Sequence, residues 1–269
     1  MPAFRSVVPV AGLAEQVLSG CADSIPSMAG GFDVGQEVAA SLGSRQGTWR
    51  FIRRYAECWL TPLSDDDGWP EAGLHAAEQR LGLQLPPAIR EAYGLFGRRQ
   101  DLTSVQDRLL GPDQLAVDTT GEVLVHRVEN QSVAVWGVPL ATMDEADPAV
   151  VVAQNFEDDG WQPFLERFSL ACVEMVLSES LFSAPLELSD NRPLDPTAAA
   201  LVEQRFARLA IPDYPLWALP GASVHWFTGP DLLLRDDGGT WLWVRARTTA
   251  ALDAVRSTLP GEWLMLPDG

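Results

Sequence analysis

The chain has 269 residues and a formal net charge of −18, from 37 acidic and 19 basic side chains. Such a charge repels the phosphates of nucleic acids and of anionic membranes, and this argues against both as partners. All 19 basic residues are Arg, so reactions that need a lysine, such as Schiff-base formation with pyridoxal phosphate, are excluded.

The remaining composition, 46% hydrophobic and 21% charged, is typical of a globular protein with one large or two small domains. No apolar stretch approaches the roughly 18 residues of a transmembrane helix. The Cys and His residues lack metal-ligand spacing, and no glycine-rich phosphate loop occurs, which predicts no metal, no cofactor and a cytoplasmic location. The candidate nucleophiles are Cys58 and Cys172. Both fall in predicted helices without a neighbouring base, which favours a packing role over a catalytic one.

The N-terminal part of the chain predicts a flexible lead-in followed by helices. Residues 1–47 are rich in Gly, Ser and Ala without periodicity, so we expect a poorly ordered or accessory segment. A broad apolar stripe predicts a helix from Thr48 to about residue 60. A second helix is expected over 71–81, and a third begins at Pro86–Pro87 and ends near residue 97.

The spacing of apolar residues then changes from helical to alternating. Residues 122–129, 133–138 and 149–154 predict three strands of an antiparallel meander. Helices are expected over 169–182 and 196–210.

The C-terminal part again predicts strands before a helix. The expected elements are strands at 222–227, 231–235 and 240–246, a helix at 248–258 and a closing strand at 262–266. Helices and strands come in runs, which favours an α+β fold with helices on a central mixed or antiparallel sheet. Trp241 and Trp243 share one face of their strand, where they either pack under a helix or anchor a partner.

Most of the negative charge lies in the middle of the chain. Residues 110–195 hold 16 acidic and three basic side chains, so −13 of the −18 falls there. We predict that a partner binds at two acidic loops in this region. The predicted partner-binding residues are Asp144, Glu145, Asp147, Glu157, Asp158, Asp159 and Trp161. The alternative is a solvated surface that only aids solubility.

Several segments resemble the bacterial SUKH superfamily, also described as Smi/Knr-like domains. The resemblance covers residues 50–182, in AAEQRLGLQLPPAIREAYGLFG, LLGPDQLAV, VENQSVAVWGV and DPAVVV. The residues that carry it most specifically are Leu85, Pro86, Tyr93, Glu129, Asn130, Gln131, Trp136, Gly137, Asp147 and Pro148. The Trp-containing strands and helix near the C-terminus are similar to an extension of actinobacterial members. Gly97-Arg98-Arg99-Gln100 departs from the Asn-Gly that often follows the third helix in the family.

The resemblance implies a SUKH-like domain over 48–190, with a strand–helix extension over 191–269 packed on it. It also implies no catalytic residues, since many bacterial members are similar to immunity proteins that block a toxin. Toxic nucleases are commonly basic, so an acidic inhibitor suits them. We therefore expect a non-enzymatic module that binds a basic toxin domain. A regulatory or scaffold module for an endogenous protein is the alternative, and an enzyme would need a deep polar pocket.

Overall fold

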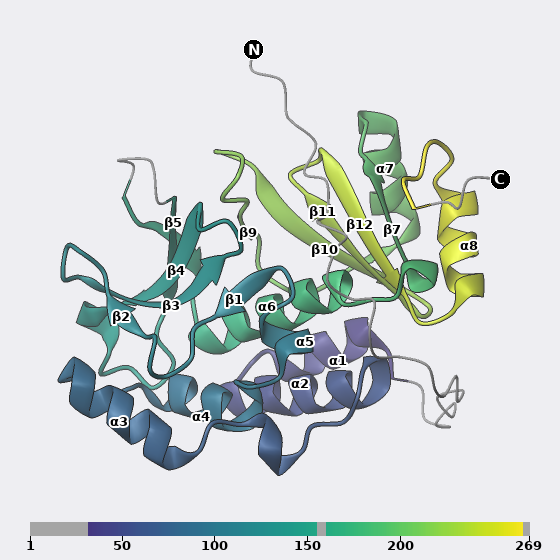
Figure 1. Cartoon of the computed structure of the whole chain (residues 1–269). Helices are drawn as coiled ribbons and strands as arrows, with labels where there is room; N and C mark the ends of the chain where they lie inside the picture. Colours follow the sequence, from purple (N-terminus) through teal and green to yellow (C-terminus); the bar gives the residue numbers. More distant parts are fainter. Residues whose placement is uncertain (1–31, 155–159, 266–269) are drawn as a thin grey trace. The chain divides into compact units, whose positions relative to one another are not determined.

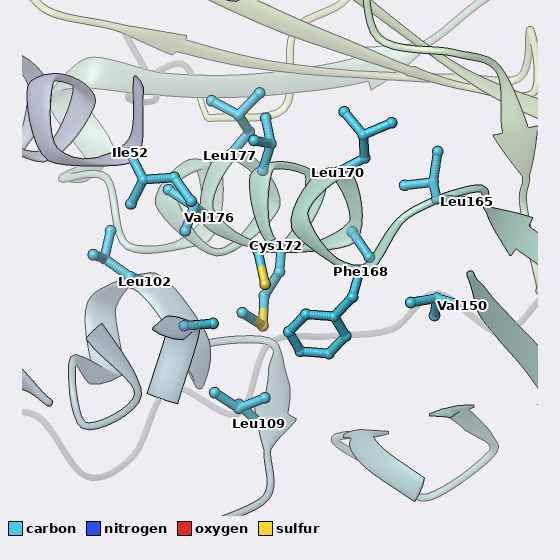
Figure 2. Packing of buried hydrophobic residues seen from close by; sticks show 14 of the residues in the cluster. Ile52, Leu102, Leu109, Val150, Leu165, Phe168, Leu170, Cys172, Val176 and Leu177 are labelled. Atoms are coloured by element: carbon cyan, nitrogen blue, oxygen red, sulfur yellow. The ribbon is translucent and has the colours of Figure 1, made fainter. Parts of the chain in front are cut away.

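A single helix, α6 (Phe168–Phe182), forms the centre of the fold. The computed structural model describes residues 32–154 and 160–265. In it, α6 packs against three other helices and contacts strands of two antiparallel sheets (Figure 1). Fourteen of its 15 residues are buried, because apolar residues are distributed all around the helix and its buried polar side chains have partners inside the fold. Figure 2 shows how Leu170, Cys172, Val176 and Leu177 pack in its surroundings.

The helices that precede the first sheet begin earlier in the chain than expected. They are α1 (Val34–Ser41), α2 (Arg45–Trp59), α3 (Glu71–Leu81), α4 (Pro87–Phe96) and α5 (Gln100–Thr103). The side chains of Asp33 and Ser44 cap α1 and α2, and Val38 is fully buried. The folded part therefore begins before Thr48, and the rest of the predicted lead-in, residues 1–31, lies outside the described residues.

The first sheet, called sheet A, contains the predicted meander. Its strands are β1 (Asp107–Leu109), β2 (Ala116–Val117), β3 (Val123–Glu129), β4 (Ala134–Pro139), β5 (Val150–Gln154) and β6 (Gln162–Leu165). The order is β1-β3-β4-β5-β6, with β2 also paired to β3, and every pair is antiparallel. The register shifts between Val125 and Arg127, which marks a bulge in β3.

The second sheet, called sheet B, is built from the C-terminal strands. They are β7 (Ser189–Pro193), β8 (Ala207–Arg208), β9 (Tyr214–Pro215), β10 (Ser223–Gly229), β11 (Leu232–Asp237) and β12 (Trp241–Ala246). The order is β7-β12-β11-β10-β8, again antiparallel, with β9 paired to β10. The α+β prediction is confirmed, and both sheets are antiparallel, not mixed.

Two helices, α7 (Pro196–Arg205) and α8 (Thr249–Thr258), form a second core with sheet B. The predicted helix over 196–210 is too long, because Ala207–Arg208 pair with β10 as a strand. The predicted strand over 262–266 is wrong for residues 262–265, which form no strand. Instead Trp263 is buried in this core, with the Arg192 guanidinium 5.4 Å from its ring centre.

The tryptophan pair of β12 faces the end of α6. The Trp243 and Phe182 rings lie 5.0 Å apart, and Trp243 Nε1 donates a hydrogen bond to Asp237 Oδ2 at 2.9 Å. Trp241 packs beside Trp243, with 6.1 Å between their rings. Of the two interpretations of this pair, the structure supports packing within the protein.

Candidate functional site

The loop that follows β4 presents two carboxylates to solvent on a fixed backbone. Asp144 and Glu145 are exposed, between the 3₁₀ turn η2 (Leu140–Thr142) and β5. The next carbonyl, that of Ala146, accepts hydrogen bonds from Ala88 N at 3.0 Å and Arg45 Nη1 at 2.9 Å. The loop is thus held to α4 and α2, while its two carboxylates remain available to a partner.

Asp147, predicted to bind a partner, holds the start of α6 instead. Its two carboxylate oxygens accept hydrogen bonds from Ser169 N at 2.9 Å and Ser169 Oγ at 2.6 Å. The adjacent Pro148 carbonyl accepts from Phe168 N at 2.6 Å. Both residues therefore satisfy donors at a helix N-terminus, which is a structural role.

Trp161 lies half-buried and makes a hydrogen bond with an aspartate that the sequence analysis did not single out. Its Nε1 donates to Asp118 Oδ2 at 3.2 Å. Asp118 also accepts from Glu122 N, Val123 N and Thr120 Oγ1. Burial raises the pKa of Asp118, but these hydrogen bonds outweigh it and hold the pKa well below its usual range. The predicted Glu157, Asp158 and Asp159 lie outside the described residues.

Four carboxylates gather at one end of sheet A. Glu122 is exposed and immediately precedes β3, and its carbonyl accepts from Leu140 N, where η2 begins, at 2.8 Å. That contact links the Asp118–Glu122 turn to the loop with Asp144 and Glu145. We call Asp118, Glu122, Asp144 and Glu145 the acidic end. The only sequence signal for Asp118 and Glu122 is their position in a polar segment next to a strand, which many ordinary turns share.

Four other acids of the region 110–195, Glu129, Glu174, Glu179 and Asp190, are buried, so not all of the regional negative charge lies on the surface. Glu174 and Glu179 bind Arg127, with N–O distances of 2.7 and 3.0 Å. The fully buried Asp190 carboxylate binds Arg256 at 2.6 Å. These carboxylates are therefore not accessible to a partner.

The residues that carry the family resemblance are mainly structural. Leu85, Pro86, Tyr93, Trp136 and Gly137 are buried. The Tyr93 hydroxyl donates to Leu110 O at 2.7 Å, and the Trp136 and Phe164 rings lie 6.2 Å apart.

The Glu129-Asn130-Gln131 segment forms the turn between β3 and β4. The buried Glu129 carboxylate accepts from Gln131 N at 2.7 Å and Val133 N at 3.3 Å, which closes the turn. Asn130 and Gln131 are exposed there. Its side chains and backbone therefore serve the turn between the two strands.

Beneath sheet A, Arg127 joins a buried group of carboxylates. Its guanidinium contacts Glu174, Glu179 and, at 3.1 Å, Asp107. Burial, with Glu179 and Glu174 nearby, raises the Asp107 pKa to about 6 although Arg127 lowers it. Glu179 also accepts hydrogen bonds from three consecutive backbone N–H groups, at residues 105–107. These contacts fix β1 and β3 on α6.

His126 and Cys172 line a small cavity next to this group, together with Trp136 and Phe168. Burial lowers the pKa of His126 to about 3, helped by Arg127, so the ring is neutral at physiological pH. Burial raises the pKa of the Cys172 thiol well above its usual range. A nucleophilic cysteine needs the opposite shifts, a thiolate beside an imidazolium. This pair therefore behaves as packing residues.

A second hollow lies between β5, β6 and residues 215–221, and its lining includes Gln154, Gln162 and Trp217. None of the described residues that line it has a titratable side chain. Within residues 32–154 and 160–265, no cluster of three or more His, Cys, Asp or Glu side chains is placed to hold a metal ion. None of the helices in that part of the chain is long and apolar enough to cross a bilayer.

Comparisons with protein-family models, with curated proteins and with solved structures found no match. The resemblance to the SUKH superfamily stays a prediction.

Proposed function

We propose that the protein is a non-enzymatic binding module of the immunity type, which neutralises a basic protein such as a nuclease toxin domain. It would bind this partner through the acidic end. The observation that carries the proposal is the gathering of four carboxylates from separate segments at one end of sheet A. Several other acids of the region are buried and paired inside the fold, and exposed ones such as Glu166 and Glu187 lie on separate segments, whereas the acidic end brings several carboxylates together.

The geometry of the acidic end suits recognition of arginine and lysine side chains. The backbone of the loop with Asp144 and Glu145 is fixed by hydrogen bonds from α2 and α4 to the Ala146 carbonyl, so ordering this loop on binding costs little backbone entropy. Exposed carboxylates speed the encounter with a basic surface, and this attraction weakens as salt is added. Charge complementarity of this kind controls the association rate more than the dissociation rate.

Charge reversal tests the proposal directly. The variant E122R/D144R/E145R removes three of the four carboxylates and leaves Asp118, which holds the 118–123 turn. With a basic toxin domain sought among the products of neighbouring genes as the partner, we expect the affinity of the variant to fall by about 100-fold or more in 50 mM salt, mainly through slower association. The wild-type affinity should fall steeply between 50 and 300 mM salt, and the variant's should change little.

The matched control reverses three exposed acids elsewhere, in D65R/D66R/E187R. It changes the net charge by the same amount but leaves the acidic end intact. We expect it to retain most of the wild-type affinity. Equal losses in the two triple variants would mean that net charge alone, and not this site, attracts the partner.

A further inference from the structure

The two faces of sheet A differ in what covers them. On the inner face, Leu124, Trp136, Val138 and Val152 are buried in the core that surrounds α6. On the outer face, cross-strand pairing aligns two rows of residues. The rows are Ala116–Val125–Gly137–Val151–Pro163 and Arg108–Val128–Val135–Ala153.

The outer face is apolar although solvent reaches it. Val125, Val128, Val135, Val151 and Ala153 are all half-buried, and the ends of the first row, Ala116 and Pro163, are exposed. All members of both rows are described, and Arg108 alone is charged. An antiparallel sheet with one solvated face normally places polar residues there. A contiguous, accessible apolar face is typical of a binding surface.

The acidic end borders this face. Strand alternation places Asp118 on the outer side, because Val117 pairs with the inner residue Leu124. Its hydrogen bond to Trp161 brings the indole to the same side. The surface thus combines an apolar centre with a carboxylate border, which matches the usual anatomy of a protein interface.

We propose that the outer face of sheet A is the centre of the docking surface, and that its occupant is a basic protein surface with apolar side chains between its arginines or lysines. This proposal rests on the proposed function and adds the apolar contact to it. The carboxylates orient and attract the partner, and the valine rows exclude water from the centre of the contact.

Designed peptides separate the two contributions. The probes are a peptide that alternates Arg and Leu, a peptide of equal charge that alternates Arg and Ser, and a peptide that alternates Glu and Leu. We expect the Arg–Leu peptide to bind the full chain at least tenfold more tightly than the Arg–Ser peptide, and the Glu–Leu peptide not to bind. Equal affinity for the two basic peptides would overturn the apolar contact. If charge reversal at the acidic end then weakened both equally, the proposed function would still stand.

The matching protein variants leave the charge unchanged. V135Q/V151Q should reduce the affinity for the Arg–Leu peptide at least tenfold, to that of the Arg–Ser peptide, and leave the latter unchanged. The control V105Q/L186Q replaces two exposed apolar residues outside both rows and should have no effect. Circular dichroism checks folding, and the near-isosteric V135T replaces the double variant if that variant unfolds. An unchanged Arg–Leu affinity, or a wild-type dimer in sedimentation that V135Q/V151Q dissociates, would overturn the proposal.

Discussion

The contribution of Asp107 to the stability of the folded protein depends on pH. Three carboxylates, those of Asp107, Glu174 and Glu179, share the Arg127 guanidinium, and the last two are almost fully buried. The imbalance of charge falls on Asp107, the most accessible of the three, whose pKa of about 6 exceeds the 3.8 of an ordinary aspartate. Because the folded state binds this proton more tightly, the contribution of Asp107 to stability is present below about pH 4 and lost as pH rises through 6.

D107N should therefore stabilise the protein at neutral pH. A shift of about two pKa units corresponds to about 3 kcal/mol, so we expect a gain of about 1–3 kcal/mol in the unfolding free energy at pH 7 and little change at pH 4. Urea denaturation at both pH values measures it, with the exposed D66N as control. A loss of stability in D107N at pH 7 would show that the Asp107–Arg127 ion pair outweighs the burial of the carboxylate.

Two acids of the loop between η2 and β5 have different roles: one holds a helix and the other faces solvent. Asp147 holds the N-terminus of α6, whereas Glu145 is exposed on the surface proposed to bind the partner. We expect D147A to lower the unfolding free energy by about 1–2 kcal/mol, because two donors at Ser169 lose their acceptor, and to leave partner affinity unchanged. E145A should lower the partner affinity and leave the unfolding free energy unchanged. Thermal unfolding and a binding titration on both variants check this, and a loss of affinity in folded D147A would contradict the assignment.

The elements that the sequence predicts best are those with local signals. The helix expected over 71–81 matches α3 because Gly82, with φ of 68°, ends it, and Pro86–Pro87 begins α4 as expected. Short strands lack such signals: β6 contains Pro163, and β8 has two residues. Their pairing is decided by neighbours distant in sequence.

The same limit applies to the site. Asp144 and Glu145 could be found from charge density alone, and the structure leaves them exposed. In sequence, Asp147 resembles Asp144 and Glu145. Its partner Ser169 lies 22 residues away, so its hydrogen bonds to the start of α6 could not be predicted from the sequence. Glu174 and Glu179 count toward the acidic middle region, yet both are buried and form ion pairs with Arg127, which lies 47 and 52 residues from them in sequence.

In the whole molecule, α6 forms polar contacts with residues of both sheets. Arg127 of sheet A binds Glu174, and Arg235 of sheet B donates to Ser178 Oγ at 3.0 Å, one turn further along the helix. Arg245 of β12 binds the Ser180 carbonyl and, at 2.7 Å, the Trp59 carbonyl. The C-terminal strands therefore supply hydrogen-bond donors and apolar cover that the preceding part of the chain needs.

Removal of residues 191–269 should abolish cooperative folding of the remainder. We expect the full chain to unfold in a single transition, and residues 1–190 to show no cooperative melt, because buried α6 carbonyls and apolar side chains would be exposed. Circular dichroism and tryptophan fluorescence during heating measure both chains. A truncated chain that melts cooperatively within a few degrees of the full chain would show that 48–190 folds independently.

The most direct test of the binding surface is a hydrogen–deuterium exchange footprint of the full chain with and without a basic toxin domain sought among the products of neighbouring genes. We predict slower exchange in the 116–128, 134–145 and 150–154 segments, which carry the acidic end and the valine rows. Exchange in α7 and α8 should stay unchanged. Protection confined to α7, α8 or the N-terminal helices, with sheet A unaffected, would contradict the account.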